Sequence, residues 1–226
     1  MNLLRVILNS FLLASPFAGH AQAIEPVPTL KFYGGLGVYS SNNQRLGSWY
    51  GSAQIPVQAV AGYQLRPRLA MQLSVAYSGN RDGYDYPSIS YYTAPPSTIA
   101  NVAGTYTERR STTSLLARYT LTKKPHHRFQ ADVIGGVKFE YNRYHDVGTQ
   151  TTPSQPTPVV TPYDNPSTYN STQLSIGPSL RYRIVARLEA VYDFTFDQPV
   201  SSGGSRYGLR PTSSMALGLR YHFGPS

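Results

Sequence analysis

Apolar and polar side chains alternate repeatedly along the chain beyond residue 29, in runs that each have the length of one strand. Alternation with a period of two places successive side chains on opposite faces of a β-strand, and a tilted strand needs about 9–11 residues to cross a bilayer. Eight runs follow this pattern, at residues 30–38, 55–65, 69–77, 114–121, 129–141, 174–182, 188–196 and 215–223. The pattern therefore predicts eight antiparallel strands.

The connections between these runs alternate in length. Short links lie at residues 66–68, 123–128 and 185–187. Long links, rich in Gly, Pro, Ser, Thr, Asn and Tyr, lie at residues 41–52, 78–105, 146–171 and 198–211. Short turns at one rim and long loops at the other are typical of outer-membrane barrels, which keep the short turns in the periplasm. We expect the long links to face the cell exterior.

The charged residues of the polar face decide which face meets lipid. Turned toward the bilayer, Arg118, Lys138 and Arg181 would each cost about 2–4 kcal/mol near its middle. The apolar face must therefore point outward. It carries tyrosines near the strand ends, as an aromatic girdle would. These are Tyr63, Tyr77, Tyr119, Tyr141, Tyr182 and Tyr221. The expected fold class is all-β, a closed eight-stranded antiparallel up-and-down transmembrane β-barrel.

A soluble lipocalin-like barrel is the alternative, with the apolar face inside around a ligand. The polar face mixes Gly, Ala and Ser with charges of both signs, whereas a solvated exterior is more often dense in Lys and Glu. The single tryptophan, Trp49, lies in the first long link and not in the first strand, where a lipocalin signature would place it. These features favour the membrane barrel.

The N-terminal residues have the features of an export signal. Arg5 is followed by an apolar stretch at residues 6–14 and by the small-x-small sequence Ala21-Gln22-Ala23. The apolar stretch is too short for a membrane helix, which needs about 20 apolar residues. We expect residues 1–23 to be a cleaved signal peptide and residues 24–226 to form an outer-membrane barrel in a Gram-negative bacterium.

The pattern and the rhythm of the links resemble the small eight-stranded outer-membrane barrels of the OmpA/OmpX type. The sequence Gly218-Leu219-Arg220-Tyr221-His222-Phe223 resembles the C-terminal signal read by the barrel-assembly machinery, although Gly224-Pro225-Ser226 follow it here. The resemblance implies an assembly signal at Gly218, Tyr221 and Phe223. It also implies outer-membrane lipid, lipopolysaccharide and the assembly machinery as partners.

Composition narrows the remaining chemistry. Twenty Lys and Arg against eleven Asp and Glu give a net charge of +9, but the basic residues are scattered, so a nucleic-acid partner is not expected. There is no cysteine, which excludes disulfides and thiolate metal sites. His126-His127 has no further ligands at metal-site spacing. We expect no cofactor and no metal.

A catalytic site has one candidate, because some small outer-membrane barrels modify lipids with a His beside a Ser or a carboxylate. His145-Asp146 stands at the outer end of the fifth run, but no nucleophile lies at a fixed spacing and no His-x-Ser motif occurs. The expected protein is therefore not an enzyme, with a lipid-modifying barrel as the alternative.

Polar side chains should fill the lumen, since eight strands enclose little more than their side chains and porins need about sixteen. A turn centred on residue 125 places Arg118 opposite Asp132, and one centred on residue 185 places Arg181 opposite Glu189. We therefore predict two cross-strand ion pairs inside the barrel. A register slip of two residues would instead pair Glu189 with Arg183.

Function is then expected at the outer surface. The link at residues 78–105 carries Tyr84, Tyr86, Tyr91 and Tyr92, and the link at 146–171 is a Thr/Pro-rich tract. Exposed aromatic residues are favoured in binding patches. The two links predict adhesion or binding of an extracellular partner, and the alternative is that they are solvated caps without a partner.

Overall fold

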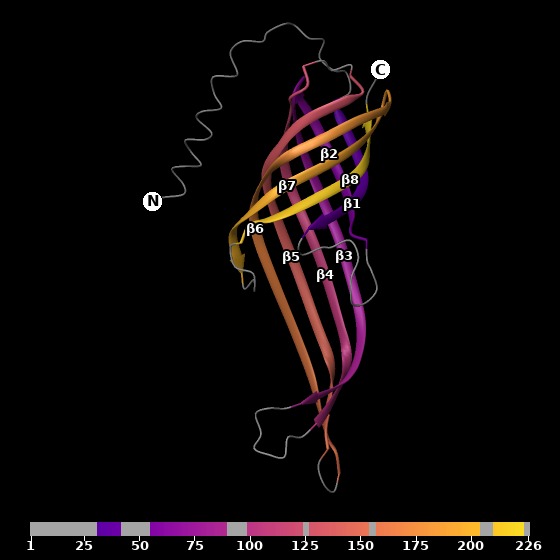
Figure 1. Cartoon of the computed structure of the whole chain (residues 1–226), viewed down its shortest axis with the longest axis vertical. Coiled ribbons are helices and arrows are strands. Elements are labelled where there is room, and N and C mark those ends of the chain that lie inside the picture. Colours follow the sequence, from indigo (N-terminus) through magenta and orange to yellow (C-terminus); the bar gives the residue numbers. More distant parts are fainter. Residues whose placement is uncertain are drawn as a thin grey trace, which may run out of the picture.

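The computed structural model describes residues 31–41, 55–89, 99–123, 127–153, 157–203 and 210–223. Eight antiparallel strands form one closed barrel, in which each strand pairs with the next and β8 returns to pair with β1 (Figure 1). The strands are β1 (Phe32–Ser41), β2 (Val57–Arg66), β3 (Leu69–Ile89), β4 (Ile99–Thr120), β5 (Phe129–Thr152), β6 (Val159–Val185), β7 (Leu188–Gly203) and β8 (Thr212–Phe223). The prediction of an all-β, eight-stranded, up-and-down barrel is confirmed.

The two faces of the barrel wall have opposite chemistry. Large apolar side chains point outward, such as Leu36 at 73% and Leu217 at 56% exposure. Polar side chains point inward, including Gln72, Asp132 and Lys138, each at most 2% exposed. The predicted orientation is confirmed. It is inconsistent with the lipocalin alternative, which needs the apolar face inside.

The seam between β1 and β8 is closed by glycines. Gly37 and Gly218 are register partners across it. A Cβ on Gly37 would lie 2.4 Å from the backbone oxygen of Leu217, and one on Gly218 would lie 2.7 Å from that of Leu36. Both distances are shorter than real Cβ contacts, so the two strands approach this closely because neither residue has a side chain.

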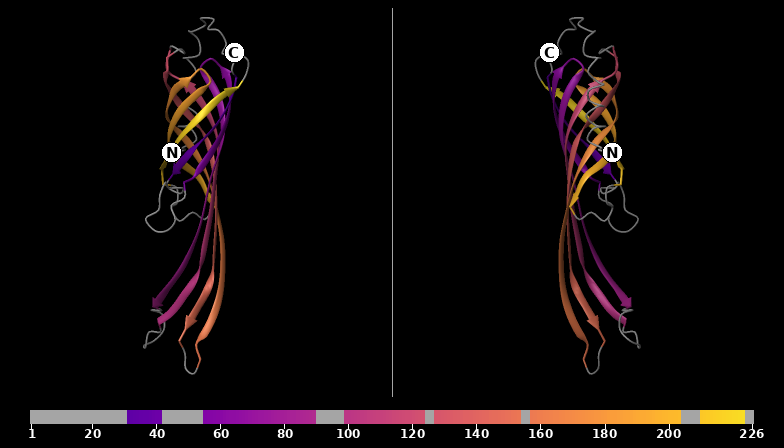
Figure 2. Two further views of the ribbon diagram at one scale, coloured as in Figure 1. Left: turned by 90° about the vertical axis from the view of Figure 1, so that its right-hand side faces the viewer. Right: turned by 90° about the vertical axis from the view of Figure 1, so that its left-hand side faces the viewer.

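Four strands are longer than the other four. β3, β4, β5 and β6 have 21, 22, 24 and 27 residues, whereas β1 and β2 have 10 each. Figures 1 and 2 show these four strands continuing beyond one rim of the barrel as a narrow, curved sheet. We call this sheet the extension. It comprises residues 78–89, 99–110, 142–152 and 159–169, which lie beyond the last β2 partner of β3 and the last β7 partner of β6.

The prediction that residues 78–105 and 146–171 are loops is therefore wrong for most of their length. β3 pairs with β4 up to Ile89↔Ile99, and β5 pairs with β6 up to Thr152↔Val159. Residues 198–211 were likewise expected to be a loop, but β7 continues to Gly203. The segments are rich in Thr, Tyr and Val, which favour strands. Outside the membrane, both faces of a sheet can be polar, so the apolar/polar contrast that marks the other strands is missing.

The short connections follow the strands after which the sequence predicts them. Turns at residues 67–68 and 186–187 join β2 to β3 and β6 to β7, and β4 is joined to β5 across residues 121–128. These short connections lie at the rim opposite the extension (Figure 1). No helix in the part of the chain that the structure describes is long and apolar enough to cross a membrane. Residues 1–23 and Trp49 lie outside the described residues.

Candidate functional site

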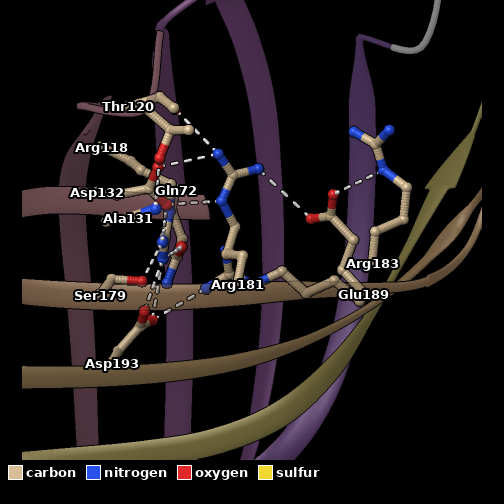
Figure 3. Close-up of polar contacts among 12 residues, drawn as sticks. Gln72, Arg118, Thr120, Ala131, Asp132, Ser179, Arg181, Arg183, Glu189 and Asp193 are labelled. Atoms are coloured by element: carbon tan, nitrogen blue, oxygen red, sulfur yellow. Dashed lines mark hydrogen bonds and ion pairs between the residues drawn. The ribbon is translucent and has the colours of Figure 1, made fainter. Parts of the chain in front are cut away.

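The lumen holds a network of ion pairs centred on Asp132 of β5, whose side chain has no exposed surface. Arg118 Nη1 of β4 donates to Asp132 Oδ2 at 2.8 Å. Arg181 of β6 donates to the same carboxylate through Nε at 2.6 Å and Nη2 at 2.9 Å. Figure 3 shows both guanidinium groups converging on this carboxylate. Two donors on one planar group give a geometrically defined bond, so Asp132 ties three strands together.

Arg118 extends the network across the lumen. Its Nη2 lies 2.8 and 3.0 Å from the two carboxylate oxygens of Asp193 on β7. Arg220 of β8 donates to the same carboxylate at 2.9 Å. Arg118 also donates to Gln72 Oε1 at 3.1 Å and to the Ser179 hydroxyl. A buried charge is tolerated when it is paired and hydrogen-bonded, and these partners meet that condition.

Glu189 of β7 anchors the end of the network near the short turns. Arg181 Nη1 donates to Glu189 Oε2 at 3.4 Å, and Arg183 Nε lies 3.9 Å from Glu189 Oε1. His222 Nε2 lies 3.1 Å from Glu189 Oε2. Arg181 is therefore placed between Asp132 and Glu189 (Figure 3).

A second cluster fills the lumen nearer the extension. Lys138 Nζ of β5 donates to Thr195 Oγ1 at 2.6 Å, to Asp197 Oδ1 at 2.8 Å and to the Ser214 hydroxyl. The ammonium also lies 5.8 Å from the ring centroid of Tyr39, within the range of a cation–π contact. Lys138 and Asp197 are both almost fully buried. The two clusters together occupy the lumen with paired polar side chains.

The structure brings together the four lumen residues predicted from the sequence, but in a different register. Arg118 is the partner of Ile134, and Asp132 is the partner of Thr120. Likewise Arg181 faces Val191, and Glu189 faces Arg183, the slipped pairing. The predicted register is thus wrong by two residues at both turns. A shift of two residues keeps every side chain on its face, so the long arginines still reach their acids diagonally.

Sequence reasoning missed Asp193, Arg220 and the Lys138–Asp197 pair. Mirror symmetry about a turn compares only strands that adjoin in sequence, whereas Arg118 of β4 meets Asp193 of β7, and Lys138 of β5 meets Asp197 of β7, across the lumen. Arg220 and Asp193 do lie on adjoining strands, but a long link separates β7 from β8, so no short turn marks a centre of symmetry there. These residues could have been found from the sequence because each is a charged residue at an inward position of its strand.

The extension presents a tyrosine-rich face, which we call the tyrosine face. Six tyrosines of the extension lie on the side that continues the lumen wall, because each is an even number of residues away from a lumen-facing residue of the same strand. They are Tyr84, Tyr86, Tyr106, Tyr144, Tyr163 and Tyr169. The Tyr84 hydroxyl donates to Asp146 and is bonded to the Tyr163 hydroxyl. Tyr144 lies 5.5 Å from Tyr169 and 6.0 Å from Tyr106, between ring centroids. Tyr91 and Tyr92 lie outside the described residues.

Charged groups accompany these rings. Glu108 accepts hydrogen bonds from Arg110, whose guanidinium lies 5.8 Å from the Tyr144 ring centroid. Burial raises the pKa of the Tyr144 phenol to about 12. The pKa of Tyr106 is also raised, first by burial and then by the nearby Glu108 carboxylate. Tyr106 and Tyr144 are therefore neutral phenols at physiological pH.

His145 and Asp146 do not act together, because neighbouring strand residues point to opposite faces. His145 Nε2 instead lies 2.7 Å from Asp164 Oδ1 on the outer face, where both side chains are exposed. Asp146 accepts from Tyr84 on the tyrosine face. Of the residues that the structure describes, none form a group of three or more metal-ligating His, Cys, Asp and Glu side chains. His127 is described, whereas His126 is not.

The residues of the expected assembly signal lie on the closing strand. Gly218 faces Gly37 at the seam. Tyr221 and Phe223 point outward with 41% and 51% exposure, and their ring centroids are 5.1 Å apart. Recognition of these residues by the barrel-assembly machinery stays a prediction.

The neighbours among solved structures are outer-membrane barrels. A major outer membrane protein from Thermus thermophilus aligns with a TM-score of 0.50 and 17% identity, over 85% of this chain and 98% of that one. The N-terminal β-barrel domain of Pseudomonas aeruginosa OprF aligns with a TM-score of 0.45 and 13% identity, over 87% of this chain and 99% of that one. Neisserial surface protein A aligns with a TM-score of 0.41 and 13% identity, over 88% of this chain and 100% of that one.

No protein-family model and no curated protein matches the sequence. At the identities of the structural neighbours, the likeness concerns the fold alone. The closed ring of eight antiparallel strands with an apolar exterior, together with the alignment to the Thermus outer membrane protein, shows that this chain has the fold of an outer-membrane β-barrel.

Proposed function

We propose that this protein is an exported, non-catalytic outer-membrane barrel that binds an extracellular partner through the tyrosine face of its extension. The observation that carries the proposal is the gathering of six tyrosines on one side of a sheet that projects beyond the barrel. Tyrosine is enriched in binding sites because its ring supplies rigid contact area and its hydroxyl a hydrogen bond.

The barrel itself supports a purely anchoring role. Its lumen is occupied by the two ion-pair clusters, and its outer surface is apolar. An export signal at residues 1–23 and an outer-membrane location belong to the same proposal, since a β-barrel with an apolar exterior needs a bilayer around it. The extension then stands on the extracellular side, opposite the short turns.

The test compares intact cells that display the full barrel or a shortened one. Residues 80–108 and 144–167 are each replaced by an Asn-Gly turn, which joins the register partners Gly79↔Arg109 and Arg143↔Thr168 without altering the barrel. We expect the full barrel to increase adhesion of the cells to an epithelial monolayer, and the shortened one to lose that gain.

Point variants locate the binding face. Replacing Tyr106 and Tyr144 by Ala should reduce adhesion, whereas replacing the outer-face residues Val147 and Thr149 by Ala should not. Equal adhesion of cells with the full and the shortened barrel at matched surface levels would refute the binding role and leave the extension as a cap without a partner.

A further inference from the structure

The outer face of the extension carries a cluster of basic side chains next to the barrel rim. Arg109 and Arg143 are direct register partners on β4 and β5. One pair further out, Thr107 faces His145, and Arg81 of β3 faces Thr107. Arg81, Arg109 and Arg143 are exposed. All of them are an even number of residues away from outward-facing residues of the same strands, so they lie on the outer face and not on the tyrosine face.

These arginines have no ion-pair partner among the described residues, in contrast to Arg110 beside them and to the arginines of the lumen. Arg110 is paired with Glu108, and the lumen arginines are all paired with carboxylates. Like charges placed directly opposite on neighbouring strands repel each other and destabilise the pairing. The carboxylate nearest in register, Asp164, is bonded to His145. The Arg109–Arg143 pair therefore lacks an anion that would offset its repulsion.

A pocket lies where such an anion would bind. Thr107, Arg109, Arg143 and His145 line a partly open pocket of about 110 Å³. That is several times the roughly 10–15 Å³ needed to hold one water molecule. Two guanidinium groups and a threonine hydroxyl supply hydrogen-bond donors, and arginine forks match the oxygens of a phosphate in a bidentate manner.

The height of the pocket indicates the source of the phosphate. Arg143 lies two residues beyond Tyr141, and Arg109 two beyond Ser111, the register partner of Tyr141 at the rim. Two strand residues correspond to about 7 Å. The headgroup region on each side of the hydrocarbon core is about 5–7 Å thick. Below the pocket on the same face, Val137, Phe139 and Tyr141 are 44%, 46% and 41% exposed, as lipid-facing side chains are.

We propose that Arg109 and Arg143, with Thr107 beside them, bind the phosphate of a lipid headgroup in the outer leaflet, and that Arg81 adds to the local positive potential. The inference rests on the proposed outer-membrane location, but not on the binding role of the tyrosine face. It assigns the two faces of the extension to different ligands, a membrane lipid outside and an extracellular partner on the tyrosine face.

The test is a titration of the purified full-length barrel in neutral detergent with lipid A, with lipid A lacking its phosphates, and with inorganic phosphate. Wild type is compared with the Arg109→Gln/Arg143→Gln variant. We expect the double variant to bind lipid A at least about tenfold more weakly, which corresponds to about 1.4 kcal/mol. We also expect wild type to bind the dephosphorylated lipid no better than the double variant binds lipid A.

The control is Lys31→Gln/Arg66→Gln, which removes the same charge from exposed residues near the opposite rim and should bind lipid A as wild type does. An equal loss in this control would show only a general effect of charge and would overturn the site. Unchanged binding in the Arg109→Gln/Arg143→Gln variant would overturn it as well. Inorganic phosphate binding as tightly as lipid A would refute the lipid as the source. Cell adhesion and fractionation test the proposed function separately, so the two failures are distinguishable.

Discussion

Asp132 is the residue on which the lumen network depends most directly. Its buried carboxylate accepts bonds from Arg118 and Arg181, so Asp132→Asn would leave two guanidinium groups short of a counter-charge. Breaking a buried ion pair by removing one partner costs about 3–5 kcal/mol. We expect a clearly lower urea midpoint for loss of the compact, fast-migrating form on gels.

Asp164→Asn is the control for that variant, because its exposed carboxylate is paired with the exposed His145. Exposed ion pairs contribute about 0–1 kcal/mol, so its midpoint should stay near that of wild type. Equal midpoints for the two variants would contradict a stabilising role of the lumen network.

A variant of His145 tests whether the protein is a lipid-modifying enzyme. The His145 ring is bonded to the exposed Asp164 carboxylate and is 41% exposed, and no activated nucleophile accompanies it among the described contacts. We expect His145→Ala to leave lipid A and phospholipids of overexpressing cells unchanged by mass spectrometry. An acylation pattern that changed with overexpression and reverted in the variant would place the protein among lipid-modifying enzymes.

At the scale of elements, the extension should respond to alkaline pH. Burial raises the pKa of Tyr144 to about 12, and the pKa of Tyr106 is raised in the same direction. The folded extension holds these protons more tightly than the unfolded chain, whose phenols titrate near pH 10. The stability that depends on the neutral phenols is therefore complete below about pH 10 and is lost as the pH rises toward 12.

We expect the protection of the extension against hydrogen exchange, measured relative to an unstructured chain at the same pH, to fall over that interval, while the barrel strands stay protected. Tyr106→Phe/Tyr144→Phe, which removes both ionisable groups, should keep the extension protected to higher pH, and Tyr141→Phe at the rim should not. Equal exchange profiles for the double variant and wild type would contradict the assignment.

The direction of the strands relative to the membrane is a second prediction at this scale. Protease added to whole cells should cut within residues 78–105 or 146–171, because the ends of the extension stand farthest from the bilayer (Figure 2). The turn at Lys123-Lys124 should be cut only after the outer membrane is opened. Cleavage at that turn in intact cells would mean that the topology is inverted.

For the whole molecule, we expect a monomeric barrel in the outer membrane. Because its backbone hydrogen bonds close into a ring, the barrel should stay folded in detergent at room temperature and shift in gel mobility only after heating. It should also fractionate with sarkosyl-insoluble envelope material. Recovery as a soluble periplasmic protein would contradict both the location and the lipid site that rests on it.

The barrel strands were predictable because each has one face toward lipid and one toward a polar lumen. That contrast imposes the alternation of apolar and polar residues, as at Phe139 and Lys138. From the alternation followed the number of strands and the order of long and short connections. The inward positions of Arg118, Asp132, Arg181 and Glu189 followed as well. For the four long strands, the sequence predicted only the part inside the barrel and not its continuation into the extension. Beyond Tyr77 and Tyr141 the outward positions become mostly polar, and a polar sheet has the same composition as a polar loop.

The tertiary structure decided what the alternation leaves open. A slip of two residues preserves every inward and outward position, so the pattern could not distinguish Arg118↔Asp132 from the observed Arg118↔Ile134. Closure of the ring then brought together residues from strands that do not adjoin, such as Arg118 with Asp193 and Lys138 with Asp197. The sequence by itself determined which side chains are inside, because lipid and lumen impose a period of two. Only the closed barrel determined which of them meet, because those contacts cross the lumen.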